Sequence, residues 1–230
     1  MTGVPGLLDR KIAWGTKNIA EGPAMTREQA IRSIEIGIEI AEENVRKGYK
    51  VFSIGEMGIS NTTSSACILG TFNHWNAIEV TGRGTNISDE RLIHKVEVVQ
   101  KAMDVNHPDP KDGLDVLAKV GGFEFGCLTG VILGAAANHA MTIIDGFNTT
   151  ASAFIAKALA PQVTDYLMAS HLSLEQAHKK SLAALGLSEY IDLDFRLGES
   201  IGAGIQKKML DMAISVYREC VTKEEAGVEA

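Results

Sequence analysis

The chain alternates between long runs with helical spacing and short apolar runs. The first long run begins at Thr26 and ends near Lys47, with isoleucine, alanine and valine recurring every three or four residues. Thr26 and Gln29 form the pattern of a capping box, and Gly48 follows the last periodic residue. Four isoleucines within this run alternate as they would in a strand. The 22-residue length and the two end signals favour a helix.

Shorter segments continue this alternation along the rest of the chain. Lys50 to Ile54 and Met141 to Ile144 are apolar runs that each end at a turn containing glycine, as buried strands do. Asn61 to Thr63 are candidate caps for the helix that follows the first of these runs. Further helices are predicted over residues 89–103, 123–137, 150–159, 174–185 and 206–219.

Strands that alternate with helices indicate α/β units around a parallel sheet. The predicted fold class is therefore α/β, with three layers in which a mostly parallel sheet is flanked by helices, as in a large Rossmann-like domain. We expect residues 1–25 to form an N-terminal lead-in segment, residues 26–222 the main domain, and residues 223–230 a polar C-terminal tail.

The composition excludes several classes of protein. With 45% hydrophobic residues among 230, the chain can bury one large core, which argues against disorder. A net charge of −7 with scattered basic residues gives no electrostatic surface for nucleic acid. No apolar run is long enough for a membrane span, and residues 1–11 lack the layout of a signal peptide. Cys67, Cys127 and Cys220 are interpreted as free thiols in a reducing cytoplasm rather than as a disulfide or metal site.

Four clusters that contain glycine lie where loops leave strands or enter helices, and loops at such places bind ligands in open α/β sheets. In the first, residues 55–63, the backbone can hold a phosphate, or the segment is a tight turn with an ordinary helix cap. The second is residues 81–85, with Lys95 following on a helix. Arg83 and Lys95 either clamp a carboxylate or phosphate, or are solvated surface charges.

The other two clusters carry a serine–histidine pair and an acid. Ser170 and His171 suggest a nucleophile and its base, but no nucleophile elbow is present, and contacts to a phosphorylated sugar are favoured instead. Glu199 lies between glycines just before the last helix. It is either a general base, which requires burial to raise its pKa, or an acid stabilised by the helix dipole. The spacing leaves both interpretations open.

Six short motifs follow one another in one order along the chain. They are Gly55-Glu56-Met57-Gly58-Ile59-x-Asn61-Thr62-Thr63, Gly82-Arg83-Gly84-Thr85, Gly121-Gly122-Phe123-Glu124, Asp145-Gly146-Phe147, Ser170-His171-x-Ser173 and Arg196-Leu197-Gly198-Glu199-x-x-Gly202-Ala203. This ordered set resembles the nicotinate-nucleotide:dimethylbenzimidazole phosphoribosyltransferase family, whose members make the lower-ligand nucleotide of cobalamin. The likeness extends to residues 15–18, 24–26 and 225–228, and so covers nearly the whole chain.

The resemblance implies transfer of the 5-phosphoribosyl group of nicotinate mononucleotide to dimethylbenzimidazole or a related base, giving alpha-ribazole phosphate and nicotinate. It makes Glu199 the base that deprotonates the acceptor and Glu56 a second essential carboxylate. The residues implied at the phosphate and ribose are Gly58, Asn61, Thr62, Arg83, Lys95, Ser173 and Gly202, and those implied at the acceptor are Met57 and Leu197. No metal or cofactor is implied. The enzyme would act in the cytoplasm as a homodimer or as a heteromer with a related chain.

The sequence departs from the family pattern in ways that leave alternatives. Ser60, Ala177 and the pair Ser200–Ile201 replace residues usual in the family, which would reshape the sugar-phosphate site. Typical members also carry an N-terminal segment that forms much of the base pocket, and this chain is expected to begin after it. The first alternative is a non-catalytic or split-enzyme subunit that pairs with a complementary chain. The second is an enzyme with a purine or phenolic acceptor.

Overall fold

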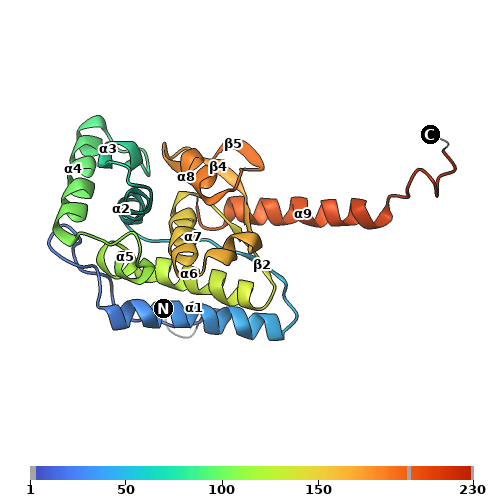
Figure 1. Ribbon diagram of the computed structural model, residues 1–230, viewed down its shortest axis with the longest axis horizontal. Helices are drawn as coiled ribbons and strands as arrows, with labels where there is room; N and C mark the ends of the chain where they lie inside the picture. Colours follow the sequence, from blue (N-terminus) through green and yellow to red (C-terminus); the bar gives the residue numbers. More distant parts are fainter. Residues whose placement is uncertain (1–3, 196–197, 229–230) are drawn as a thin grey trace.

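Two small parallel sheets flanked by helices organise the structure (Figure 1). The computed structural model describes residues 4–195 and 198–228. The first sheet holds β1 (Val51–Ser53), β2 (Met141–Ile144) and β3 (Leu167–Ala169) in that order, with Phe52 paired to Thr142 and Ile143 to Met168. The second holds β4 (His171–Ser173) beside β5 (Ile191–Phe195). The fold is therefore mixed α/β with parallel pairing, as the sequence predicts.

The strands divide between two sheets because the chain changes partners at Ser170. Its backbone N–H donates to the carbonyl of Ile144 in the first sheet (3.1 Å), whereas its carbonyl accepts from Tyr190 and Ile191 at the start of β5. The expectation of one sheet is corrected here, and β3, β4 and β5 were not predicted. Each of these strands has only three to five residues, which is too short to show a period.

The helices account for most of the remaining chain. They are α1 (Arg27–Arg46), α2 (Asn61–Asn73), α3 (Ala77–Val80), α4 (Asp89–Asn106), α5 (Gly113–Val120), α6 (Phe123–Ala137), α7 (Phe147–Leu159), α8 (His178–Leu185) and α9 (Ile201–Glu219), with a 3-10 helix at Pro161–Tyr166. The predictions for α1, with its Thr26–Gln29 capping box, and for α6 and β2 are confirmed. Helices α3 and α5 were not predicted, α7 and α9 begin before their predicted starts, and α8 begins later.

The predicted caps of α2 are wrong. Ser60 is the residue that precedes the helix, in a left-handed conformation and without a side-chain cap, so Asn61, Thr62 and Thr63 are its first three residues. Their side chains are free for other partners because they do not cap the helix. Asn61 donates to Glu56, and the Thr62 hydroxyl accepts from Lys95.

Helices α1 and α6 lie side by side with their backbones in contact (Figure 1). A Cβ atom on Gly37 would lie 1.9 Å from the carbonyl oxygen of Cys127, and one on Gly130 would lie 1.9 Å from that of Ile34. Only glycine allows this approach. The apolar core continues from α6 into α2, α5 and α7, where Phe125, Leu117 and other large side chains are buried.

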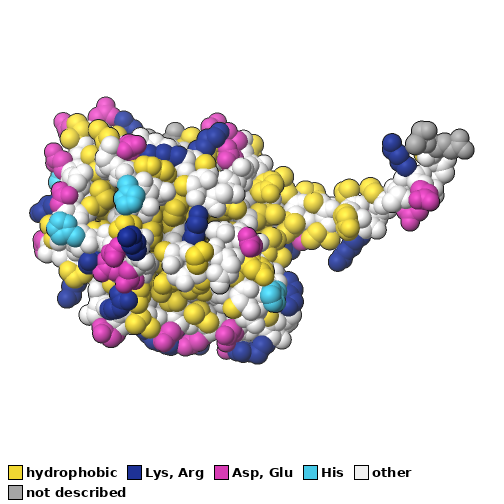
Figure 2. Space-filling view, viewed as in Figure 1, with side chains coloured by type: hydrophobic (Ala, Val, Ile, Leu, Met, Phe, Trp, Pro, Cys, Tyr) yellow, Lys and Arg dark blue, Asp and Glu magenta, His cyan; other side chains and the backbone are white. Residues whose placement is uncertain are grey.

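Helix α9 extends away from the rest of the molecule (Figure 1). Its buried residues, Gly202, Ala203 and Gln206, all lie near its start. Apolar side chains are exposed along the remainder, where Figure 2 shows a hydrophobic surface: Ile205, Met209, Met212, Ile214, Val216 and Tyr217. In the described ranges, no helix is both long and apolar enough to cross a membrane.

Candidate functional site

The loops that follow β1 and β2 meet the start of α9. Strands β1 and β2 are parallel neighbours, so their carboxyl ends lie at one edge of the sheet, where ligands bind in α/β folds. A Cβ atom on Gly55, after β1, would lie 2.1 Å from the backbone nitrogen of Ser200. A Cβ atom on Gly198 would lie 3.2 Å from Oε1 of Glu56. The structure thus brings together the two loops that carry the predicted carboxylates Glu56 and Glu199.

Two asparagine amides hold the Glu56 carboxylate. Nδ2 of Asn61 donates to one oxygen, and Nδ2 of Asn148 donates to the other at 2.9 Å. Asn148 also donates to Oδ1 of Asn61 (3.0 Å) and accepts from the Ser65 hydroxyl (2.6 Å). Asn148, near the start of α7, was missed in the sequence, although it directly follows the motif Asp145-Gly146-Phe147. The network fixes Glu56 as an acceptor of two hydrogen bonds.

A second carboxyl group, Glu124, faces the same loop from the start of α6. A Cβ atom on Gly58 would lie 2.9 Å from Oε1 of Glu124 and 2.8 Å from Nδ2 of Asn61, so a larger residue here would displace these two side chains. Burial raises the pKa of Glu124, and the nearby Glu56 carboxylate raises it further, whereas a hydrogen bond with Asn61 lowers it. Glu124 ends the motif Gly121-Gly122-Phe123-Glu124 but was not predicted as a site residue.

Asp145, at the end of β2, is buried and accepts two hydrogen bonds from the start of α9. The donors are the backbone N–H groups of Ser200 (3.2 Å) and Ala203 (2.8 Å). Burial raises the pKa of Asp145 to about 6, although these amides lower it. Nδ1 of His171 lies 3.8 Å from the carboxylate, and burial lowers the pKa of this histidine. Asp145 was also missed as a site residue.

Lys95 lies beside the Glu56 network, because it contacts Thr62, the residue after Asn61 in α2. We call Lys95 and the groups that contact it the cationic cluster. Nζ of Lys95 donates to the Thr62 hydroxyl (2.9 Å) and to the carbonyl of Gly82 (3.0 Å). Burial lowers the pKa of Lys95, and the Glu175 carboxylate raises it. Oε1 of Glu175 accepts from the N–H of Gly84 (2.7 Å). The structure therefore joins the predicted residues Thr62 and Lys95, and adds Glu175.

Ser173 lies on β4 beside this cluster, and its hydroxyl accepts from the backbone N–H of Glu175 (3.4 Å). The backbone N–H of Ser173 donates to Nδ1 of His178 (2.9 Å), and burial lowers the pKa of that histidine to about 3. The pair Ser170–His171 is fully buried, and the Ser170 hydroxyl donates to the carbonyl of Asp145 (2.9 Å). The Ser170 hydroxyl also lies 3.1 Å from Nδ1 of His171, but the full burial of both side chains argues against the nucleophile interpretation.

Arg83 does not contact Lys95 in this structure, so the shared clamp stays a prediction. Its guanidinium is exposed, pairs with Asp89 and donates to the carbonyl of Ile87 (2.9 Å). The backbone N–H groups of Asn86 and Ile87 donate to the carbonyl of Arg83, and this turn leads directly to Asp89 at the start of α4.

The remaining predicted residues surround the meeting point of the loops. Gly202 packs against His171, since a Cβ atom there would lie 1.9 Å from Nδ1 of the ring. Glu199 is exposed, so the burial expected for a general base is not found in this structure. Met57 is 69% exposed, which places it on an open side of the site. Leu197 lies outside the described residues.

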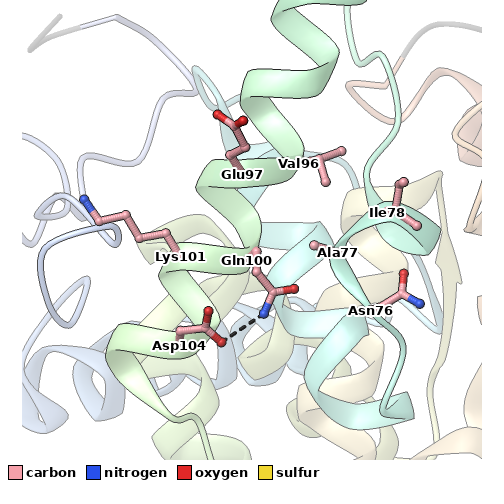
Figure 3. A pocket seen from close by; sticks show the side chains of 8 residues that line it. All are labelled: Asn76, Ala77, Ile78, Val96, Glu97, Gln100, Lys101 and Asp104. Carbon is pink, nitrogen blue, oxygen red and sulfur yellow. Dashed lines mark hydrogen bonds between the residues drawn. The ribbon is translucent and has the colours of Figure 1, made fainter.

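A separate hollow of about 570 Å³ lies between α3 and α4 (Figure 3). Its lining residues are Asn76, Ala77, Ile78, Val96, Glu97, Gln100, Lys101 and Asp104. Gln100 donates to Asp104 across its wall at 2.9 Å. None of the predicted site residues lies among these eight, so the carboxylate and cationic clusters form a separate candidate site.

Comparison with known proteins decides the family. A family model described as phosphoribosyltransferase matches residues 2–228. The chain belongs to this family. It is 47% identical over 220 residues to a nicotinate-nucleotide–dimethylbenzimidazole phosphoribosyltransferase of Clostridioides difficile (strain 630), an alignment that covers 96% of this chain and 63% of the relative. The corresponding protein of Syntrophotalea carbinolica is 51% identical over 222 residues, with 96% and 63% covered.

Solved members of this phosphoribosyltransferase family share the fold. The chain superposes on a crystal structure of CobT from Thermus thermophilus with a TM-score of 0.94 and 38% identity. A second structure from that organism, a nicotinate-nucleotide–dimethylbenzimidazole phosphoribosyltransferase, gives 0.92 and 37%. Each superposition covers 100% of this chain and 68% of the solved one. The chain spans 63% to 65% of the length of the curated relatives it matches.

Proposed function

We propose that this phosphoribosyltransferase moves the 5-phosphoribosyl group of nicotinate mononucleotide to dimethylbenzimidazole or a related lower-ligand base. The observation that carries the proposal is the meeting of the Glu56 and Glu199 loops beside the Lys95–Thr62 pair. Carboxylates and an anion-binding cluster are thereby placed at adjoining positions, which suits a substrate with a phosphate at one end and a reacting ring at the other. The names of the curated relatives support the same reaction.

In this proposal the phosphate binds at the start of α2. Lys95 and the Thr62 hydroxyl supply a cation and a donor there, and the positive end of the α2 dipole lies at the same place. Ser173 at the end of β4, Asn61 at the start of α2 and Gly202 at the start of α9 contact the ribose. The close approach allowed by Gly58 brings the backbone near the sugar. Preorganised contacts of this kind fix the anomeric carbon for attack.

The acceptor nitrogen attacks the anomeric carbon. The bond between this carbon and the nicotinate nitrogen breaks at the same time. Glu199 takes the N–H proton of the acceptor, and the bonding electrons of the broken bond neutralise the pyridinium of the leaving nicotinate. Glu56, held by Asn61 and Asn148, keeps a negative charge near the sugar as positive charge develops there. Each carboxylate thus has one task, and Met57 and Leu197 contribute to the acceptor pocket.

The test uses the purified chain with nicotinate mononucleotide and dimethylbenzimidazole, and chromatography to detect nicotinate and alpha-ribazole phosphate. We expect turnover from the wild-type chain and a fall of about 10²-fold or more in kcat for Glu199→Gln, because the general base is lost. Glu43→Gln, an exposed glutamate of α1, is the matched control and keeps full activity. Full activity of Glu199→Gln contradicts the assignment of the base.

The exposure of Glu199 and Met57 favours a second candidate, in which the chain catalyses only with a complementary polypeptide that covers these residues. The segment of the Clostridioides difficile relative that lies outside the alignment is a suitable partner to add in the assay. Activity that appears only on this addition supports a split enzyme. Equal rates with and without it, at saturating substrate, favour the chain acting alone or as a homodimer.

Three further proposals concern the context of the enzyme. We propose that residues 26–222 form the catalytic part, between the lead-in and tail segments. The described helices and both sheets lie within this range, which supports the proposal. We propose action in the cytoplasm, in keeping with the free cysteines. We propose assembly into a homodimer or a heteromer, for which the exposed apolar side chains of α9 provide a surface.

A further inference from the structure

We infer that Asp145 is a positioning residue, which acts through Glu199 by anchoring the turn and helix start that carry this glutamate. The inference rests on the proposed function, because it assigns Glu199 a catalytic task. It adds a residue that reaches the reaction without touching the substrate.

Asp145 is held in place by the first sheet. Asp145 follows β2, the middle strand of the first sheet, and its side chain is 1% exposed. Both of its carboxylate oxygens are used at α9, one by the N–H of Ser200 and the other by the N–H of Ala203. The carboxylate therefore serves as the cap of α9, supplied from a distant part of the chain.

The turn that it holds is strained. Glu199 has φ +60° and Ser200 has φ +69°, and two consecutive left-handed residues other than glycine are unfavourable. The Ser200 side chain makes no capping hydrogen bond. A turn of this kind persists only when surrounding contacts impose it. Asp145 provides a hydrogen bond directly to the second residue of the strained pair.

Packing alone does not fix the direction of Glu199. Gly55 lies against the backbone of Glu199 and Ser200, and Gly202 lies against the His171 ring, so both prevent α9 from moving closer to the sheet. Neither contact prevents the turn from relaxing outward toward solvent, where Glu199 already lies. The two hydrogen bonds of Asp145 oppose that relaxation, because they form only when α9 is seated against the sheet.

The kinetic test compares Asp145→Ala and Asp145→Asn with Asp112→Ala. Asp112 also accepts from two backbone N–H groups of a first helical turn, at α5 and away from Glu199, and is therefore a matched control. We expect Asp145→Ala to lower kcat by the order of 100-fold, the effect of a misplaced catalytic group, with KM for nicotinate mononucleotide changed less than about threefold. Asp145→Asn keeps one acceptor oxygen, so its kcat should lie between those of the wild type and Asp145→Ala.

A double-variant comparison separates positioning from general damage. If Asp145 acts through Glu199, adding Asp145→Ala to Glu199→Gln produces no further loss of kcat. A further loss of similar size in that background overturns the inference, and so does an unchanged kcat in the single variant.

Amide hydrogen exchange tests the anchor without any turnover. In Asp145→Ala the amides of Ser200 and Ala203 are expected to exchange at least about tenfold faster, while amides of α6 and α7 keep their rates. Unchanged protection at these two amides, or faster exchange throughout the protein, overturns the inference. If the wild-type chain shows no turnover, the proposed function fails, and the exchange result still decides whether Asp145 holds the turn.

Discussion

The ionisation of Asp145 gives the stability of this protein a distinctive pH dependence. Burial raises the pKa of this carboxyl from 3.8 to about 6. Between those two values the folded chain binds more protons than the unfolded chain, so the free energy of unfolding falls as the pH rises. Above about pH 6 the carboxylate is ionised in both states, and its contribution no longer changes.

The magnitude follows from the difference between the two pKa values of Asp145, 3.8 and about 6. Each unit corresponds to about 1.4 kcal/mol, so full ionisation costs the folded state about 3 kcal/mol. Integration from about pH 5 to about pH 7.5 gives a loss of about 1.4 kcal/mol. Asp145→Asn cannot ionise, so its free energy of unfolding should gain about this amount relative to the wild type over the same range.

The assay is urea unfolding followed by circular dichroism at pH steps from about 5 to about 7.5, with the free energy extrapolated to water. Two titratable groups face Asp145 from other elements, Glu56 from the loop after β1 and His171 from β4. The same pair of measurements in a Glu56→Gln background isolates Asp145 from its carboxylate neighbour. A wild-type minus variant difference that stays constant within about 0.5 kcal/mol, or that changes in the opposite direction, refutes the reasoning.

Other predictions test the packing, the cationic cluster and the thiols. Gly202→Ala should lower the free energy of unfolding by about 1–3 kcal/mol because its Cβ meets a buried histidine ring, whereas Gly204→Ala, with open space around it, should be neutral or raise it by up to about 1 kcal/mol in thermal denaturation. Lys95→Gln should weaken binding of inorganic phosphate and nicotinate mononucleotide about tenfold or more by calorimetry, and equal affinity would remove Lys95 from the phosphate site. A thiol reagent should modify the exposed Cys220 rapidly and Cys67 only after unfolding, because burial raises the pKa of Cys67 to about 12, and mass spectrometry of native and unfolded samples checks this order.

The sequence predicts best those elements whose signals are local. Helix α1 has a complete capping box and a regular apolar period, and α6 and β2 are bounded by glycine and Asp-Gly turns. Helix α9 shows the opposite case. Its start is fixed by Asp145, 58 residues before Ala203 in the chain, so no local pattern marks it and the prediction begins five residues late at Gln206.

The candidate site shows the same division. Glu56, Thr62 and Lys95 were found through motifs and their resemblance to a family, and the structure places them at adjoining positions. Asn148 and Glu124 gain their importance from what lies opposite them after folding, and an asparagine or glutamate at a helix start is usually a cap or a first-turn acid. Arg83 pairs with Asp89, six residues on, a contact made after folding that its motif does not indicate.

The contact between α1 and α6 shows that some glycines of this protein serve helix packing rather than a loop. Gly37 on one helix and Gly126, Gly130 and Gly134 on the other lie where a single methyl group would strike the opposite helix. The space between the two helices accounts for these glycines without any contact to a ligand. A comparison of relatives that ranked positions by invariance alone would give them the same weight as Gly58. The position of each glycine, between the helices or beside Glu56, therefore separates a packing requirement from a binding one.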